Sequence, residues 1–247
     1  TIMIFRPFYY FDTGCAAYVV GCGGKGLCAV VDPQERDLNS YITFAESKGM
    51  RITHVVDTHI HADHRSARRL LAEAEDAKYC LHHSADVNFA FTPLNDGEFI
   101  ELGNVSMQVL HTPGHTSEAI CLVVIDHTRG SDPWFVLTGD TLFVGAVGRP
   151  DLPGDTEVSA AQLYESLHQR LLTLPENLEF YPAHFSGSVC GAGMSGKPMS
   201  TLAFEKRFNP TISLSKEEFI SKISSGILAK PAEMEEILLY NRGAKYP

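Results

Sequence analysis

Length, composition and charge exclude several classes of protein. The 247 residues are 44% hydrophobic and 20% charged, which rules out a disordered, collagenous or coiled-coil chain. Lys and Arg number 20 against 30 Asp and Glu, and the formal net charge of -10 disfavours nucleic acid and anionic membranes as partners. No stretch approaches the roughly 20 apolar residues of a membrane span. Six cysteines without a Cys-x-x-Cys pair predict reduced thiols in a cytoplasmic protein.

Strands and helices alternate in the predicted elements. In chain order they are strands 15–22 and 27–32 joined by a Gly-rich turn, helix 37–48, strand 52–57, helix 65–75, strands 78–82, 98–102, 105–111, 119–125 and 134–138, helix 160–172 and strand 178–181. In helix 65–75 the spacing places Leu70 and Leu71 inward and Arg68 and Arg69 outward. This order predicts an α/β layered fold with two sheets packed between helices.

The tail from Gly187 differs in composition from the rest of the chain. Residues 187–200 are rich in Gly and Ser and are expected to form a loop, and helices are predicted over 201–207, 215–224 and 231–241. No linker long enough to separate this tail is present. We therefore expect a single domain over residues 1–247, with a core of about 1–186 and a C-terminal extension of about 187–247.

Four ligand-type side chains fall within six residues after a predicted buried strand. The run is Thr58-His59-Ile60-His61-Ala62-Asp63-His64. On an extended segment His59 and His61 project the same way, and Asp63 and His64 lie in the turn that follows. Neutral imidazole and carboxylate suit zinc, iron or manganese. Solvated loop residues would explain one such histidine, but a cluster of four favours a metal site.

Three further segments repeat the pattern of a polar ligand at the end of a strand. His115 follows Gly114, Asp140 follows Gly139, and His184 follows Ala183. Pro or Gly near each ligand fixes the turn and lets backbone segments approach closely. Each segment alone is a weak signal, but together they predict one metal centre.

The order T-H-x-H-x-D-H, G-H-T, G-D and A-H resembles the metallo-β-lactamase superfamily, from Phe8 to His184. The resemblance implies an αββα sandwich, here with a C-terminal helical extension, and a metal site at one edge between the two sheets. It implies a first metal position formed by His59, His61, His115 and Asp140, and a second formed by Asp63, His64, His184 and Asp140. Asp32 resembles the superfamily's early aspartate that supports the ligands; a turn role before Pro33 stays open.

A finer match points to one branch of the superfamily. Gly148-Arg149-Pro150-Asp151-Leu152 resembles the persulfide dioxygenase (sulfur dioxygenase) branch, and in particular bacterial members related to the type fused to rhodanese. The segments 181–184, 187–191 and 204–210 are also similar to this group. In fused members a rhodanese domain follows an N-R-G motif, which lies here at 241–243, so we expect no rhodanese domain in this chain.

The branch implies one Fe(II) per chain, held by His59, His115 and Asp140, and oxidation of glutathione persulfide by O2 and water to sulfite and glutathione. The expected catalytic residues are Arg149, Asp151, Asp63 and His64. A surface ion pair is the alternative for Arg149. Cys190 is either a thiol that exchanges persulfide near the site or an inert loop cysteine.

The ligand-type residues also allow other functions. A zinc or mixed-metal hydroxyacylglutathione hydrolase of the glyoxalase II type would bind two metals through the same side chains. A non-catalytic metal-binding or interaction module is a third interpretation. The expected partners are glutathione persulfide and O2, a separate rhodanese or other sulfurtransferase, and a second copy in a homodimer. Nucleic acid and membrane are not expected.

Overall fold

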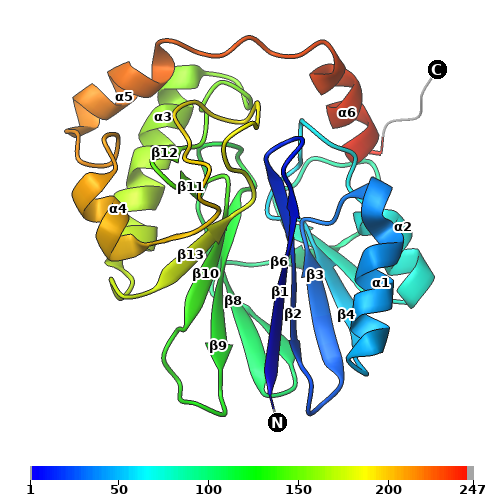
Figure 1. The fold of residues 1–247 in the computed structure, drawn as a ribbon. Helices are drawn as coiled ribbons and strands as arrows, with labels where there is room; N and C mark the ends of the chain where they lie inside the picture. The colour runs from blue at the N-terminus through cyan, green and yellow to red at the C-terminus, as the bar shows by residue number, and fades with distance from the viewer. Residues whose placement is uncertain (1, 244–247) are drawn as a thin grey trace.

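Residues 2–243 are described by the computed structural model; Thr1 and residues 244–247, at the two ends of the predicted domain, lie outside it. The described strands form two six-stranded sheets and a small two-stranded sheet (Figure 1). The first sheet has the order β1 (Met3–Tyr10), β2 (Cys15–Cys22), β3 (Leu27–Val31), β4 (Arg51–Val56), β5 (Lys78–His82) and β6 (Thr92–Leu94). The second has the order β14 (Ser200–Thr201), β13 (Glu179–Pro182), β10 (Phe135–Gly139), β9 (Ile120–Asp126), β8 (Val105–His111) and β7 (Phe99–Leu102). The small sheet pairs β11 (Leu142–Phe143) with β12 (Ala146–Val147).

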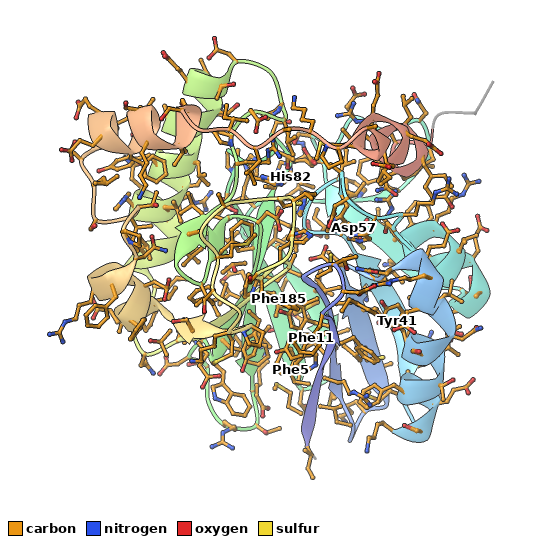
Figure 2. All side chains as sticks on the ribbon, turned by 45° about the horizontal axis from the view of Figure 1, so that its top comes forward. Phe5, Phe11, Tyr41, Asp57, His82 and Phe185 are labelled. Atoms are coloured by element: carbon orange, nitrogen blue, oxygen red, sulfur yellow. The ribbon has the colours of Figure 1, made fainter. Side chains whose placement is uncertain are left out.

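The main core lies between the two large sheets. Along β2 the side chains alternate: Tyr18 and Val20 face the other sheet, and Ala17 and Val19 face the helices. Both faces of this strand are therefore buried, which explains its continuous apolar run. Phe5 of β1 joins the sheets, because its ring centroid lies 4.5 Å from that of Phe135 (Figure 2).

Helices cover the outer face of each sheet, so the expected αββα sandwich is confirmed (Figure 1). The first sheet carries α1 (Leu38–Ser47), α2 (Arg68–Glu75) and the short η1 (Glu35–Asp37). The second carries α3 (Thr156–Glu165), η2 (Ser166–Arg170), η3 (Leu171–Thr173), α4 (Leu202–Phe208) and α5 (Lys216–Ser224). Among residues 2–243 no helix has both the length and the apolar character needed to cross a membrane.

Two local predictions were wrong. Strand β1 and the short strands β6, β11, β12 and β14 were not predicted. The helix predicted over 160–172 begins earlier, at Thr156, because the Asp155 side chain caps it by accepting a hydrogen bond from the Val158 N–H. In α2 the orientation is reversed for two residues: Arg68 is buried beside Asp57, and Leu70 is 43% exposed.

The C-terminal extension crosses the edge of the sandwich at which the ligand-type segments follow their strands. Helix α5 packs against α3 on the side of the second sheet. The chain then runs over the top of the molecule to α6 (Glu233–Asn241), on the side of the first sheet (Figure 1). The extension therefore touches both halves of the sandwich.

Candidate metal centre

Three buried side chains present their ligand atoms to one point. The Nε2 atom of His115 lies 3.1 Å from Oδ2 of Asp140, and Nε2 of His59 lies 3.6 Å from the same oxygen. These three atoms are buried and have no hydrogen-bond partner within the described chain. Buried polar atoms are almost always paired, so three unpaired atoms at one point fit a bound metal ion.

Hydrogen bonds on the far side of both imidazoles fix the tautomer that metal binding requires. The Nδ1–H of His115 donates to the carbonyl oxygen of Arg149 over 2.9 Å. The Thr58 hydroxyl donates to the Asp32 carboxylate, so its oxygen accepts from Nδ1–H of His59 over 3.1 Å. Each Nε2 atom is therefore left with a free lone pair.

The charges of the three ligand-type groups also suit a metal. Burial lowers the pKa of His59 well below its ordinary value, so the ring is neutral at neutral pH. Burial alone would raise the pKa of Asp140, but the neighbouring imidazoles of His184, His59 and His115 hold it well below its usual range. The His59 imidazole, the Asp140 carboxylate and the unpaired Nε2 atom of His115 together form a donor set for zinc or non-haem iron.

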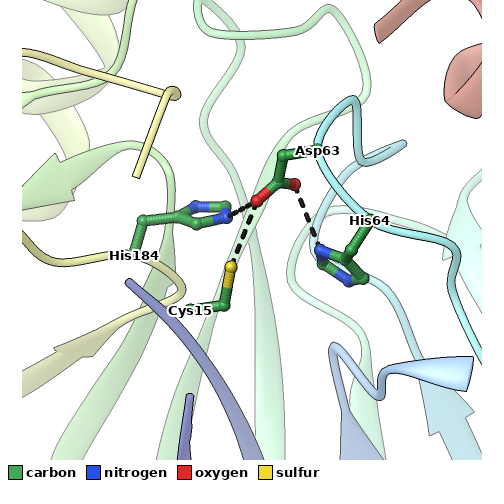
Figure 3. Close-up of side chains that lie close together, drawn as sticks. All are labelled: Cys15, Asp63, His64 and His184. Carbon is green, nitrogen blue, oxygen red and sulfur yellow. Dashed lines mark hydrogen bonds and ion pairs between the residues drawn. The ribbon is translucent and has the colours of Figure 1, made fainter. Parts of the chain in front are cut away.

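A second group of ligand-type residues is closed by its own hydrogen bonds (Figure 3). His184 contacts Asp140 Oδ1 through Nδ1 at 2.5 Å and Asp63 Oδ2 through Nε2 at 2.8 Å. The other oxygen of Asp63 pairs with Nδ1 of His64 at 3.1 Å, and the Cys15 thiol donates to Asp63 over 3.2 Å. Only Nε2 of His64 lacks a partner among the described atoms of these four side chains.

Asp32 supports the ligand loop, as the sequence predicts, and also makes a turn. It accepts hydrogen bonds from the Thr58 backbone N–H over 2.8 Å and from Nε2–H of His61 over 2.9 Å. Its φ of 54° is left-handed, a strained conformation for a residue other than glycine. His61 lies in a buried group with Asp32 and Asp57, and its Nδ1 atom has no partner in the described chain.

Two glycines let backbone segments approach the ligands. A Cβ atom at Gly148 would lie 2.0 Å from the carbonyl oxygen of Asp140. Gly139 has a φ of +52°, and a Cβ atom there would lie 2.7 Å from the Thr58 hydroxyl. A larger residue at Gly148 would displace Asp140, and one at Gly139 would displace Thr58, which holds His59.

Arg149 is buried, so the surface ion pair considered for it is wrong. Its guanidinium pairs with both oxygens of Asp151, at 2.7 and 2.8 Å, and donates to the backbone carbonyls of Val189 and Leu228. The side chains of Arg149 and Asp151 are 6% and 8% exposed. The guanidinium thus joins three loops, and the backbone of the same residue holds His115.

Cys190 lies against the centre and is 1% exposed. Its thiol shares a buried group with Asp140 and His184, and burial raises its pKa to about 12. A thiol in this state is a poor nucleophile. On the other side of the centre, Asp63 and His64 line a cavity of about 410 Å³ together with Arg36 and Arg65.

Sequence reasoning missed the residues that support the ligands from behind. Thr58, Cys15 and Asn241 contact the ligand residues or their backbone, and Glu118 accepts a hydrogen bond from the Ile60 backbone N–H over 2.8 Å. Thr58 is the first residue of the motif, and Glu118 lies three residues after His115, so both were within reach. Cys15 and Asn241 come from distant segments, and nothing local in the sequence marks them.

Residues 10–184 match the Metallo-beta-lactamase superfamily. The chain belongs to this superfamily. Within it, the persulfide dioxygenase ETHE1, mitochondrial, of Bos taurus is 28% identical over 218 residues, which cover 88% of this chain and 79% of the relative. A hydroxyacylglutathione hydrolase of Nitrosococcus oceani is 29% identical over 231 residues, covering 83% and 84%.

Solved structures of the superfamily also superpose on this chain. A metallo-beta-lactamase from Staphylococcus aureus subsp. aureus COL superposes with a TM-score of 0.92 at 34% identity, covering all of this chain and 74% of its own. ETHE1 from Myxococcus xanthus superposes with a TM-score of 0.84 at 29% identity, covering 98% and 100%. The resemblance to persulfide dioxygenases is thereby confirmed, and the fold together with the ligand-type clusters supports a metal cofactor.

Proposed function

We propose that the protein is an iron-dependent dioxygenase that oxidises glutathione persulfide, with one Fe(II) per chain held by His59, His115 and Asp140. Two neutral imidazoles and a carboxylate are the ligand set of many non-haem iron oxygenases. When bound, the iron would offer neighbouring open positions to the persulfide sulfur and to oxygen. The overall reaction balances as glutathione persulfide, O2 and H2O giving glutathione, sulfite and two protons.

The observation that carries this proposal is the contrast between the two groups of ligand-type residues. The three ligand atoms of His59, His115 and Asp140 have no hydrogen-bond partner among residues 2–243. Both nitrogens of His184 and both oxygens of Asp63 are instead engaged with one another or with neighbours. A single ion would complete the first group without breaking any hydrogen bond. A second ion would have to displace the contacts of His184. This contrast supports one metal per chain.

The surrounding residues would orient the iron ligands and select the substrate. Thr58 and the Arg149 carbonyl hold the two imidazoles, while Asp151 keeps the Arg149 side chain in place. We propose that substrate enters by the cavity of about 410 Å³, where Asp63 and His64 form the inner wall. Arg36 and Arg65 line the same cavity, and guanidinium groups pair with carboxylates such as those of glutathione.

The cellular compartment, the oligomeric state and the partner of the enzyme are also proposals. All six cysteines are buried and free, which supports a reducing, cytoplasmic compartment. We propose a homodimer whose persulfide is supplied or exchanged by a separate rhodanese or other sulfurtransferase. Sedimentation of the purified protein tests the oligomeric state.

Thioester hydrolysis is the second candidate. The Nitrosococcus oceani relative is a hydroxyacylglutathione hydrolase, and this chain carries all seven ligand-type residues, including His61, His64 and His184. With zinc or a mixed pair of metals, these residues would support attack of a metal-activated water on a carbonyl.

One experiment separates the two activities. Protein reconstituted anaerobically with Fe(II), and a second sample with Zn(II), are each assayed for O2 uptake with glutathione persulfide and for hydrolysis of a glutathione thioester. Our proposal predicts about one iron per chain, one O2 consumed for each sulfite formed, and no hydrolysis above the rate of an Asp140→Ala control. Two bound metals with thioester hydrolysis and no O2 uptake would instead establish the hydrolase.

A further inference from the structure

The C-terminal helix α6 inserts one polar side chain beneath the ligand loop. The Nδ2 group of Asn241 donates to the carbonyl oxygens of His61 and His64, over 2.8 and 2.9 Å. Its Oδ1 atom accepts a hydrogen bond from the Ser66 backbone N–H over 2.9 Å. Asn241 is 2% exposed. Both amide protons and the amide oxygen are thus used on a single loop, residues 61–66.

The backbone of Asn241 extends the same network. Its carbonyl oxygen accepts a hydrogen bond from Nη2 of Arg68 over 2.9 Å. Arg68 in turn pairs with Asp57 over 2.8 Å, and the Ser66 hydroxyl donates to the same carboxylate oxygen over 2.7 Å. The ion pair is buried, with side chains 3% and 0% exposed. The end of α6, the start of α2 and the end of β4 are therefore held in one arrangement.

The loop cannot supply these hydrogen bonds itself. Residues 57–64 lie outside regular helix and strand, so no neighbouring turn or strand satisfies the carbonyls of His61 and His64. A buried carbonyl that is left unpaired destabilises the folded state. An apolar residue at 241 would fill the space but would leave both carbonyls unpaired.

Helix α6 lacks the apolar face of a helix that only covers a core. Its buried residues are Met234 and Asn241, and Met234 belongs to none of the main core clusters. Other contacts of the helix with this region involve Arg65, which pairs with Glu236 at 3.4 Å and lies over the ring of Tyr240. The central contact of the helix is thus made to the backbone of the ligand loop.

We propose that Asn241 is a positioning residue, which sets the backbone of residues 61–66 and thereby the directions of His61, Asp63 and His64. The inference rests on the proposal that this loop belongs to a metal centre, and does not depend on which reaction the metal supports. Groups that support metal ligands from behind typically contribute tenfold to a hundredfold to metal affinity. Loss of Asn241 should loosen the loop without unfolding the sandwich.

The test compares Asn241→Asp with Met234→Ala in the full chain. Asn241→Asp keeps the size of the side chain and an acceptor for Ser66, but it turns an oxygen toward the carbonyls of His61 and His64. Met234→Ala weakens the packing of the same helix and leaves these hydrogen bonds in place. The readouts are the exchange rates of amide hydrogens in residues 59–66 of the metal-free protein and the melting temperature.

Asn241→Asp should raise the exchange rates of these amides by at least about tenfold relative to Met234→Ala, because the hydrogen bonds to two loop carbonyls are lost. Equal rates in the two variants, at matched losses of melting temperature, would overturn the proposal and reduce Asn241 to a packing residue. If Asn241→Asp does not fold, Asn241→Ala, which introduces no repulsion, carries the same comparison. Hydrogen exchange does not require turnover, so an inactive wild-type enzyme would contradict the proposed function and leave this test intact.

Discussion

The imidazole of His115 is held on one side by the Arg149 carbonyl and is unpaired on the other. We expect His115→Ala to lose most of its iron and all activity, because one of three ligands is removed. The protein should stay folded, since its core does not depend on the metal. Metal analysis and circular dichroism of the purified variant test this. Full iron occupancy would contradict the ligand assignment.

Arg149 should affect the rate of the reaction without contacting the metal. Its guanidinium holds Asp151 and two loop carbonyls, and its backbone holds His115, so Arg149→Ala should shift the loop that orients the ligand. We expect kcat/KM to fall by about 1–3 kcal/mol of transition-state stabilisation, with iron retained. Arg149→Lys should recover only part of the loss, because an ammonium cannot reproduce the planar fork.

Steady-state O2 uptake and iron content of both variants provide the measurement. Wild-type kinetics in Arg149→Ala would show that the contacts of the Arg149 guanidinium have no influence on the reaction. The neighbouring Lys230, which donates to the Asp151 carbonyl from an exposed position, offers a control in Lys230→Ala.

Variants at His61 and His64 distinguish a centre with one metal ion from a centre with two. If the centre holds one iron on His59, His115 and Asp140, alanine at either position should lower turnover more than iron content. In a two-metal site, each change should remove about one metal per chain. Metal-to-protein ratios of the two variants and the wild type decide between these outcomes, and a clean loss of one of two metals would rule out the one-iron centre.

At the scale of elements, a stacked pair of histidines joins the two sheets. His82 at the end of β5 and His111 at the end of β8 have ring centroids 3.9 Å apart and nearly parallel planes (Figure 2). Burial, with His111 and His83 nearby, lowers the pKa of His82 to about 4, and Asp96 opposes this only in part. The folded protein therefore keeps His82 neutral, while the unfolded chain protonates it below about 6.5.

Stability should consequently fall as the pH drops from about 6.5 to about 4, because the unfolded state binds the proton first. We expect His82→Phe, which keeps the stack and cannot titrate, to lose less melting temperature between pH 7 and pH 4.5 than the wild type does. His127→Asn, at an exposed position, is the control and should behave like the wild type. An equally steep loss in His82→Phe would exclude this pair as a source of acid sensitivity.

Most helices and strands could be predicted because their apolar periodicity is a local property of the sequence. Elements and contacts that depend on distant residues were missed. Strand β1 contains Arg6 and Pro7, which weaken a strand signal, and the structure tolerates them because β1 is an edge strand. Arg68 was expected in solvent because its partner Asp57 lies eleven residues away, just after β4. The candidate ligand residues were predicted from their spacing, and the structure brings them together. Supporting groups such as Asn241 depend on contacts between distant parts of the chain, which spacing does not reveal.

At the scale of the whole molecule, the metal should add stability without creating the fold. Cores between the sheets and under the helices hold the sandwich together. Fe(II) at a hundred times its dissociation constant would add about 2.7 kcal/mol, or about 5–10 °C in melting temperature for a chain of this size. Calorimetry with Fe(II) and with a chelator measures the difference. Complete unfolding on chelation would contradict this expectation.

The contact of Asn241 with the ligand loop joins residues 175 to 180 positions apart. During synthesis the loop therefore leaves the ribosome long before the side chain that holds it. Until α6 emerges, the carbonyls of His61 and His64 must bond to water, and the nascent site stays open and unable to hold its ligands in place. A ribosome paused before the codon for Asn241 should carry a chain with both sheets assembled and with residues 61–66 not yet held in place, so this loop reaches its final arrangement only after α6 has been translated.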